Sequence, residues 1–315
     1  MTDESTAIGR IGWIGTGRMG AAMAGRLAGA GVDLSVWNRT RSKAEPLTQI
    51  GATLVDSIAD LADRDVVFTM VSSDSDLDEV LVGDGGLLRQ DGPAPGVVVD
   101  STTVSAETSR AMRASCAAVG AEFLAAPVSG NAKVVAAGKL SLVVSGPEAV
   151  YKRVLPLLQF LGQHVTYVGD DDTARLVKIC HNLFLGVVTQ SMAEITVLAE
   201  RGGVSRAAFL DFLNHSVMGS IFTRYKTPAF VHLDYAPTFT PILLRKDFDL
   251  GLAAARELDV PMPLAAATAQ LVQVMVSSGR TSEDFALMLE QQAMLSGFTL
   301  EAEDTPVDDG LTPRS

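Results

Sequence analysis

The sequence is poor in the residues from which disulfide frameworks and metal centres are built. Its 315 residues include 2 cysteines, Cys116 and Cys180, and 4 histidines that show no metal-ligand spacing. Small secreted domains are usually held together by several cysteine pairs, and zinc sites need closely spaced cysteines or histidines. We therefore expect neither a disulfide framework nor a bound metal.

Long apolar runs and positive charge are scarce as well. Although 47% of the residues are hydrophobic, no apolar run reaches the roughly 18 residues that a membrane-spanning helix needs. The N-terminal segment MTDESTAIGR is acidic, whereas a secretory signal begins with positive charge. The formal net charge of −12 argues against nucleic acid as a partner. We expect a cytoplasmic protein of about two globular domains that contacts neither membrane nor nucleic acid.

A glycine-rich turn lies near the N-terminus. Residues 10–14 (RIGWI) have the pattern of a short buried strand, and they run directly into GTGRMG and an alanine-rich helix pattern. In this strand–turn–helix context, the glycines allow a tight turn and let the backbone approach a pyrophosphate at the helix N-terminus. A second strand pattern, VDLSVW, follows at once and favours a dinucleotide site. The predicted cofactor contacts in this turn are Gly15, Thr16, Gly17, Arg18, Met19 and Gly20.

The end of that second strand predicts which dinucleotide is bound. NAD sites usually place an aspartate or glutamate there to hold the ribose hydroxyls. This chain has Asn38, Arg39 and Thr40 instead. Arg39 can pair with a 2′-phosphate as a planar fork, and no carboxylate is present to repel that phosphate. We predict NADP(H) as the cofactor; an ordinary basic helix start is the alternative.

Further strand patterns predict the rest of this domain. Short apolar runs at 66–71, 97–100, 121–125, 140–144 and 165–169 alternate with helical patterns, which is typical of a mainly parallel, doubly wound sheet. Ligands of such sheets bind beyond the carboxyl ends of the strands. The candidate residues at those ends are Val71, Ser72, Thr103, Ser129, Gly130 and Asn131. Helix caps and turns are the alternative, since small polar residues favour both.

Residues 170–200 have the longest uninterrupted helix pattern in the chain. The apolar residues that predict one buried face are Leu176, Ile179, Leu183, Val187, Val188, Met192, Ile195 and Leu198. Lys178 and Asn182 are four residues apart and so share a face. Two such polar groups on a mostly buried helix are costly unless something binds there. We predict that this face is the catalytic wall of a cleft between two domains; neighbouring His181 points about 100° away from Asn182, and its role stays open.

The predicted fold class is α/β with three parts. A Rossmann dinucleotide-binding domain spans 1–168, and an all-α domain spans 169–298, beginning with the interdomain helix 170–200. Residues 217–238 are expected to be a linker within the second domain. The acidic, proline-containing tail 299–315 is expected to be disordered.

Four motifs occur in a characteristic order. They are GWIGTGRMGAAMAGRL, APVSGNAKVVAAGKL, LVKICHN and RKDFDLGL. Together they resemble the β-hydroxyacid dehydrogenase family, which includes 3-hydroxyisobutyrate dehydrogenase, tartronate semialdehyde reductase and the succinic semialdehyde and glyoxylate reductases. The resemblance covers roughly Ile11 to Ala293. It implies hydride transfer between a nicotinamide and a small β-hydroxy acid or semialdehyde.

The resemblance also implies roles for individual residues. Lys178 would be the general acid/base and Asn182 would orient the substrate. Ser129, Gly130 and Asn131 would hold a substrate carboxylate. Thr103 would contact the nicotinamide side, and Lys246 would close over cofactor and substrate, with Asp249 one turn further along that helix. A lysine in a dry cleft suits acid/base chemistry because burial disfavours its charged form.

Other readings remain open at this point. Lys246 and Asp249 are also consistent with a solvated helix face. Ala125, Asn131 and Lys133 depart from the usual family pattern, so the reaction type is a firmer expectation than the substrate. Imine reductase or reductive aminase chemistry is one alternative, although those enzymes generally carry aspartate or tyrosine in place of Lys178. A non-catalytic NADP-binding scaffold is another. The long apolar helix also predicts a homodimer or homotetramer.

Overall fold

The computed structural model describes residues 9–90 and 92–311. The chain divides into two compact units, Met1–Lys178 and Ile179–Ser315, which are called the N-terminal and C-terminal units below. The boundary falls within the long helix whose first residues belong to the N-terminal unit.

The N-terminal unit is built on a parallel sheet of six strands. They are β1 (Ile11–Ile14), β2 (Leu34–Trp37), β3 (Thr53–Leu54), β4 (Val66–Thr69), β5 (Val97–Asp100) and β6 (Glu122–Ala125). Their order is β3-β2-β1-β4-β5-β6, and every neighbouring pair is parallel. This order, which reverses beside the first strand, confirms the Rossmann fold that the sequence predicted.

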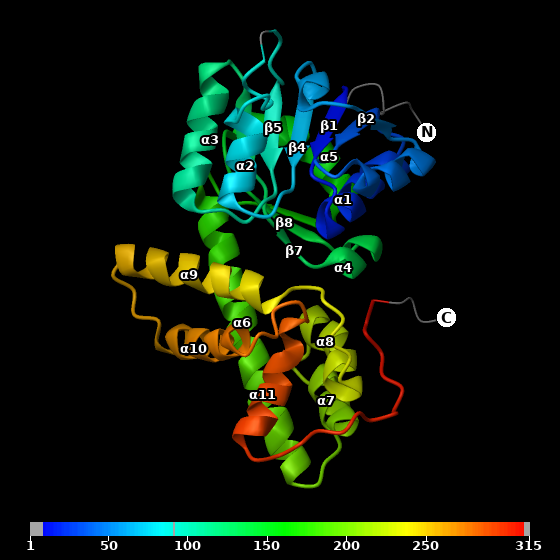
Figure 1. The fold of residues 1–315 in the computed structure, drawn as a ribbon, viewed down its shortest axis with the longest axis vertical. Helices are drawn as coiled ribbons and strands as arrows, with labels where there is room; N and C mark the ends of the chain where they lie inside the picture. The colour runs from blue at the N-terminus through cyan, green and yellow to red at the C-terminus, as the bar shows by residue number, and fades with distance from the viewer. Residues whose placement is uncertain (1–8, 91, 312–315) are drawn as a thin grey trace. The chain divides into compact units, whose positions relative to one another are not determined.

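Helices cover both faces of this sheet. They are α1 (Arg18–Gly29), α2 (Asp74–Val82), α3 (Ala106–Ala118) and α5 (Glu148–Leu161), with α4 (Ala132–Ala136) and the 3₁₀ helices η2 (Arg41–Lys43), η3 (Glu45–Ile50) and η4 (Ile58–Leu61) in the connections. In Figure 1, α2 and α3 lie on one side of the sheet, and α1 and α5 lie on the other.

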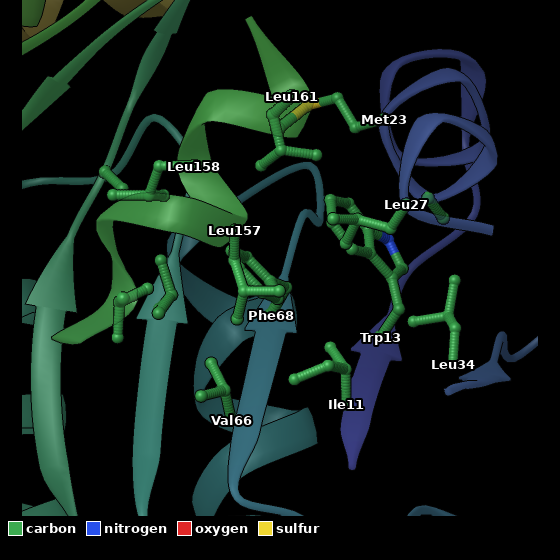
Figure 2. Close-up of a cluster of buried hydrophobic side chains, with 14 of the residues drawn as sticks. Ile11, Trp13, Met23, Leu27, Leu34, Val66, Phe68, Leu157, Leu158 and Leu161 are labelled. Carbon is green, nitrogen blue, oxygen red and sulfur yellow. The ribbon is translucent and has the colours of Figure 1, made fainter. Parts of the chain in front are cut away.

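Successive side chains of each strand point to opposite faces of the sheet, so each face has its own hydrophobic core. Trp13 and Phe68 belong to the core under α1 and α5, whereas Ile14 and Val67 belong to the core under α2 and α3. Figure 2 shows Leu27 of α1 beside Trp13 and Leu157 of α5 beside Phe68. Because both faces are buried, the strands read as continuous apolar runs in the sequence.

Two of the expected strands lie in a separate sheet. The strands β7 (Val128–Ser129), β8 (Ser141–Val144) and β9 (His164–Tyr167) form a three-stranded sheet, in which β7 and β8 are antiparallel. The expectation that residues 140–144 and 165–169 extend the parallel sheet was therefore wrong. The chain turns back after β7 through α4, so β8 pairs with β7. Directly after β8, Ser145 forms an antiparallel bridge with Ala125 of β6.

In the described residues of the C-terminal unit the regular elements are all helices, as expected. Its helices are the greater part of α6 (Thr173–Arg201), then α7 (Arg206–His215), α8 (Ile221–His232), α9 (Pro241–Glu257), α10 (Pro263–Ser277), η5 (Phe285–Leu287) and α11 (Met288–Leu295). The expected linker at 217–238 contains α8, so that expectation was wrong. A capping box between Ser220 and Thr223 starts this helix. Pro228 inside it hides the helix pattern in the sequence.

The acidic tail also differs from its expectation. Residues 299–311 pack on the C-terminal unit, while 312–315 lie outside the described residues. The Glu303 carboxylate accepts hydrogen bonds from the backbone N–H groups of Arg206 at 2.6 Å and Ala207 at 3.0 Å. Buried Arg206 in turn donates to the carbonyl of Glu301. A carboxylate at the N-terminus of α7 is favourable for the helix, which explains the order in this segment.

The apolar residues of α6 are only partly buried. Ile179, Leu183 and Met192 are buried, but Leu176 is 41% exposed and Leu198 72% exposed. The prediction of one buried face was therefore wrong in part. By length and composition α6 could cross a membrane, with half of its most apolar stretch buried inside the protein. Core helices meet the same criterion, so this is weak evidence for a span.

Candidate functional site

The glycines of the first turn serve two different purposes. Gly15 has φ +94°, and a Cβ at Gly20 would lie 1.9 Å from the Gly15 carbonyl oxygen. These two glycines are required by the protein's own backbone. A Cβ at Gly17, by contrast, would meet nothing within 4 Å. The turn therefore leaves open space directly at the N-terminus of α1.

This open space fits the pyrophosphate of a dinucleotide. Gly17 is the N-cap residue of α1 and supplies no side-chain cap, and the first turn of the helix holds no acidic residue. Uncapped N–H groups at a helix N-terminus attract phosphate. The buried Thr16 hydroxyl also has no hydrogen-bond partner among the described residues. A nicotinamide dinucleotide bound here would supply or accept a hydride.

The residues after β2 are held in place by Asn38. The Thr16 N–H donates to Asn38 Oδ1 at 2.8 Å, and Asn38 Nδ2 donates to the Thr40 carbonyl at 2.8 Å. The Arg39 side chain is 69% exposed and forms ion pairs with Asp76 at 3.3 Å and Glu79 at 3.0 Å. The sequence predicted Asn38, Arg39 and Thr40 together but missed these acidic partners on α2.

The carboxyl ends of β4 and β5 are joined by side chains that the sequence analysis missed. The Val71 N–H donates to Thr102 Oγ1 at 3.1 Å, and the Thr102 N–H donates to Asp100 Oδ1 at 3.1 Å. This places Val71 beside the segment that carries Thr103. Ser72, the neighbour of Val71, is exposed. The available signal was Asp100 itself, a carboxylate that ends an otherwise apolar strand.

Arg175 attaches the start of α6 to Asp100 at the end of β5. Its guanidinium pairs with Asp100 at 2.5 Å, and the two side chains are 1% and 0% exposed. Arg175 lies three residues before the partly buried Lys178 on one continuous helix. The sequence gives no local sign that Arg175 is buried, because its partner is 75 residues away.

The predicted carboxylate cradle follows β7. Ser129 is half-buried at the end of this strand. Gly130 has φ +139°, and a Cβ there would lie 2.8 Å from a Val134 methyl group. Asn131 is the buried N-cap of α4, and its Oδ1 accepts a hydrogen bond from the Val134 N–H at 3.1 Å. The side chain of Asn131 thus acts as a helix cap, which leaves its backbone for the predicted ligand role; Lys133 is exposed.

In the C-terminal unit, Asn182 is fixed from two sides. Its Nδ2 donates to Asp247 Oδ2 at 2.5 Å, and its Oδ1 lies 2.9 Å from His181 Nδ1. Because an amide oxygen only accepts, Nδ1 of His181 is the donor in this pair. Lys246 Nζ lies 3.7 Å from Asp247 Oδ1, whereas Asp249 is exposed. Asp247 is a further residue that the sequence analysis did not single out.

A cavity of about 450 Å³ lies elsewhere in the C-terminal unit. Its lining includes Tyr235, Arg280, Glu283 and Met294, and it includes none of the predicted site residues. We therefore do not place the active site there.

The two cysteines differ in burial. Burial raises the pKa of the Cys116 thiol to about 12, so that thiol stays protonated, and Cys180 is exposed. Within residues 9–90 and 92–311, histidine, cysteine and carboxylate side chains form no group of three able to hold a metal ion.

Comparison with known proteins gives a consistent result. A family model described as the NAD binding domain of 6-phosphogluconate dehydrogenase matches residues 10–169. A second, described as NAD-binding of NADP-dependent 3-hydroxyisobutyrate dehydrogenase, matches residues 173–291. Glyoxylate/succinic semialdehyde reductase 1 of Arabidopsis thaliana is 31% identical, over 89% of this chain and 97% of its own length.

Solved structures agree. The 3-hydroxyisobutyrate dehydrogenase of Salmonella typhimurium is 27% identical with a TM-score of 0.81, covering 89% of this chain and 98% of its own. The reductive aminase of Aspergillus terreus, 23% identical with a TM-score of 0.55 over 89% and 98% of the two chains, shows the fold alone. With two family models in sequence along it and a relative 31% identical over nearly its whole length, the chain belongs to the β-hydroxyacid dehydrogenase family and is an NAD(P)-dependent hydroxyacid dehydrogenase or reductase.

Proposed function

We propose that the protein is an NADP(H)-dependent enzyme that transfers hydride between the nicotinamide and a small β-hydroxy acid or semialdehyde, with Lys178 as the general acid/base. The observation that carries this proposal is the open turn at Gly17, at the N-terminus of α1, in a chain of this family. The turn has the shape and the uncapped helix end that a dinucleotide pyrophosphate requires.

Several features favour NADP(H) over NAD(H). The segment after β2 offers Arg39 and no carboxylate to the 2′ position. The ion pairs of Arg39 with Asp76 and Glu79 are solvent-exposed. Exposed pairs of this kind contribute about 0–1 kcal/mol, so a 2′-phosphate can replace them at little cost. The description of the second family model, which names an NADP-dependent enzyme, supports the same preference.

Lys178 is proposed to carry the proton transfer. In the direction of reduction, the carbonyl carbon gains a hydride while Lys178 gives a proton to the carbonyl oxygen as negative charge develops there. In the direction of oxidation, Lys178 takes that proton from the hydroxyl. Its positive charge also stabilises the developing alkoxide.

The substrate is proposed to be held by its carboxylate and its reacting oxygen. The Ser129 hydroxyl and the backbone N–H groups of Gly130 and Asn131 form the carboxylate cradle. Asn182, whose amide orientation is set by Asp247 and His181, orients the substrate. Lys246 is proposed to close over substrate and cofactor.

We also propose a homodimer or homotetramer. Large apolar side chains stay exposed along α6, among them Phe184 at 68% and Leu198 at 72%. Exposed apolar surface of this kind is typical of protein–protein contacts.

Turnover of a substrate panel tests the proposal. The purified protein is assayed for NADPH oxidation with glyoxylate, succinic semialdehyde and a cyclic imine, and for NADP⁺ reduction with 3-hydroxyisobutyrate. We expect turnover of at least one of the carboxylate-bearing substrates. Turnover of the imine alone would show imine reductase chemistry instead. NADPH binding without turnover of any panel member would show a non-catalytic cofactor-binding protein.

A further inference from the structure

A buried ion pair connects the end of β5 with the first turns of α6. Arg175 Nη2 lies 2.5 Å from Asp100 Oδ2, and the side chains are 1% and 0% exposed. Arg175 Nε also donates to Ser109 Oγ on α3 at 3.1 Å, and Nη1 donates to the carbonyl of Thr102. All these groups belong to the N-terminal unit.

Asp100 also links the end of β5 to the end of β4. Its Oδ1 accepts hydrogen bonds from Thr69 Oγ1 at 2.6 Å and from the Thr102 N–H at 3.1 Å. The hydroxyl of Thr102 accepts in turn from the Val71 N–H at 3.1 Å. The network therefore fixes the ends of β4 and β5, and with them the segment that runs on to Thr103.

Arg175 attaches the start of α6 to this network. Lys178 follows three residues later, about 4.5 Å further along the axis and on nearly the same side of the helix. A rotation or slide of this first part of α6 would move Lys178 directly. The pair thus connects the predicted proton donor with the predicted nicotinamide contact through two fully buried side chains.

Stability alone is a poor reason for such a pair. Removing two charges from water costs free energy that their mutual attraction often fails to offset, and replacing a buried pair by apolar residues is often neutral or stabilising. The start of α6 also has other anchors, since Ser145 Oγ accepts from the Ala174 N–H at 3.1 Å and Arg113 pairs with Asp172 at 2.8 Å. A buried pair in this place is better explained by the geometry that it imposes.

We propose that Asp100 and Arg175 are positioning residues that hold Lys178 in register with the loop carrying Thr103. The proposal rests on the proposed function of Lys178 and Thr103. Neither Asp100 nor Arg175 needs to touch the substrate. Their role is to keep the proton donor and the nicotinamide side of the site at a fixed separation.

Charge-removing variants separate positioning from stability. Asp100→Asn and Arg175→Met each leave one buried charge without its partner, so each should lower the melting temperature by about 10 °C. The double variant Asp100→Asn/Arg175→Met removes both charges and should recover most of that loss. The position of Lys178 should not recover together with the melting temperature. In the double variant kcat should stay about 100-fold below wild type, with the KM for NADPH within about threefold of wild type. Restored kcat in the stable double variant would overturn the proposal.

Hydrogen exchange gives a readout that does not depend on turnover. In the double variant, amides of residues 101–104 and 173–178 should exchange about tenfold faster than in wild type, because local openings no longer break the network. Exchange in α7 should be unchanged. Wild-type protection at both segments in the double variant would contradict the proposal even if the enzyme turned over no substrate. Absence of wild-type turnover on the panel would instead count against the proposed function.

A neighbouring ion pair provides the matched control. Arg113→Met removes the pair with Asp172, which also ties α3 to the start of α6 but lies nearer the surface, at 23% and 10% exposure. We expect kcat within about twofold of wild type for this variant, since Arg113 donates hydrogen bonds to Asp171 and Asp172 and not to the Asp100 network. A loss of kcat equal to that of the double variant would show that any anchor of α6 has the same effect, and the specific role of Asp100 and Arg175 would be refuted.

Discussion

Arg39 is the residue on which the proposed cofactor preference depends. Its guanidinium is exposed, is attached to a segment fixed by Asn38, and has Asp76 and Glu79 as present partners. These carboxylates compete with a 2′-phosphate for the same cation. The preference for NADP(H) therefore depends on whether Arg39 pairs more strongly with a 2′-phosphate than with Asp76 and Glu79.

Substitution of Arg39 should change the affinity for one dinucleotide and not for the other. Arg39→Asp removes charge-assisted hydrogen bonds and adds repulsion, so the Kd for NADPH should rise roughly 10- to 100-fold, while the Kd for NADH stays within about threefold. Glu79→Gln should act in the opposite direction and tighten NADPH slightly, because it releases Arg39 from a competitor. Fluorescence titration of both nucleotides measures the effect. An Arg39→Asp protein that retained wild-type NADPH affinity would refute the assignment.

Single residues were predictable where the signal was local. The tight turn at Gly15 and Gly20 follows from their spacing after a strand, and the structure shows it. The cofactor contacts of this turn, Gly17 among them, stay predictions. Asp100 and Arg175 were not predictable in the same way, since neither shows a local pattern and their meaning comes from a contact across 75 residues. The functional roles of Lys178 and Asn182 stay predictions.

At the scale of elements, α6 and α9 approach each other closely at two glycines in the C-terminal unit. A Cβ at Gly186 of α6 would lie 2.3 Å from a ring carbon of Phe248 on α9, and a Cβ at Gly251 of α9 would lie 2.6 Å from a Leu183 methyl group. The same pair of helices carries the hydrogen bond between Asn182 and Asp247. Two glycines thus permit the approach on which that hydrogen bond depends.

Filling this space should destabilise the protein. Gly186→Ala gains helix propensity of up to about 1 kcal/mol, but overpacking against the buried ring of Phe248 costs about 1–3 kcal/mol. We expect a net loss in the free energy of unfolding, measured by urea denaturation. Gly25→Ala in α1 is the control: its Cβ would meet Ile50 at an ordinary 3.5 Å, so the change should stabilise by about 0.4–1 kcal/mol. A Gly186→Ala protein as stable as the Gly25→Ala protein would show that the helices separate at little cost.

Elements were predictable from the sequence to the extent that periodicity defines them. Five of the six parallel strands, α1 and the long helix were indicated by apolar patterns and turn residues, whereas the two-residue strand β3 was not. The helix α8 was missed because Pro228 interrupts its pattern while the capping box at Ser220 still starts it. The separate sheet of β7, β8 and β9 was missed because strand patterns do not report which sheet a strand joins.

For the whole molecule, the comparisons and the sequence motifs lead to one family. The doubly wound parallel sheet and the helical second unit were predictable, since both follow from the succession of patterns along the chain, whereas the order of the strands was seen only in the structure. The tail was not, because its acidic composition is typical of disorder, whereas Glu303 acts as a cap for α7. Composition describes a segment on its own, and this segment is ordered by its contacts.

The central claim is that this chain performs hydride transfer with Lys178 as its acid/base. The most direct measurement compares Lys178→Ala with wild type, using the best substrate of the panel and a separate NADPH titration. Loss of the proton donor should lower kcat by about 10²- to 10⁴-fold, while the Kd for NADPH stays within about threefold and the melting temperature is unchanged within about 3 °C. Turnover by Lys178→Ala within tenfold of wild type would contradict the account.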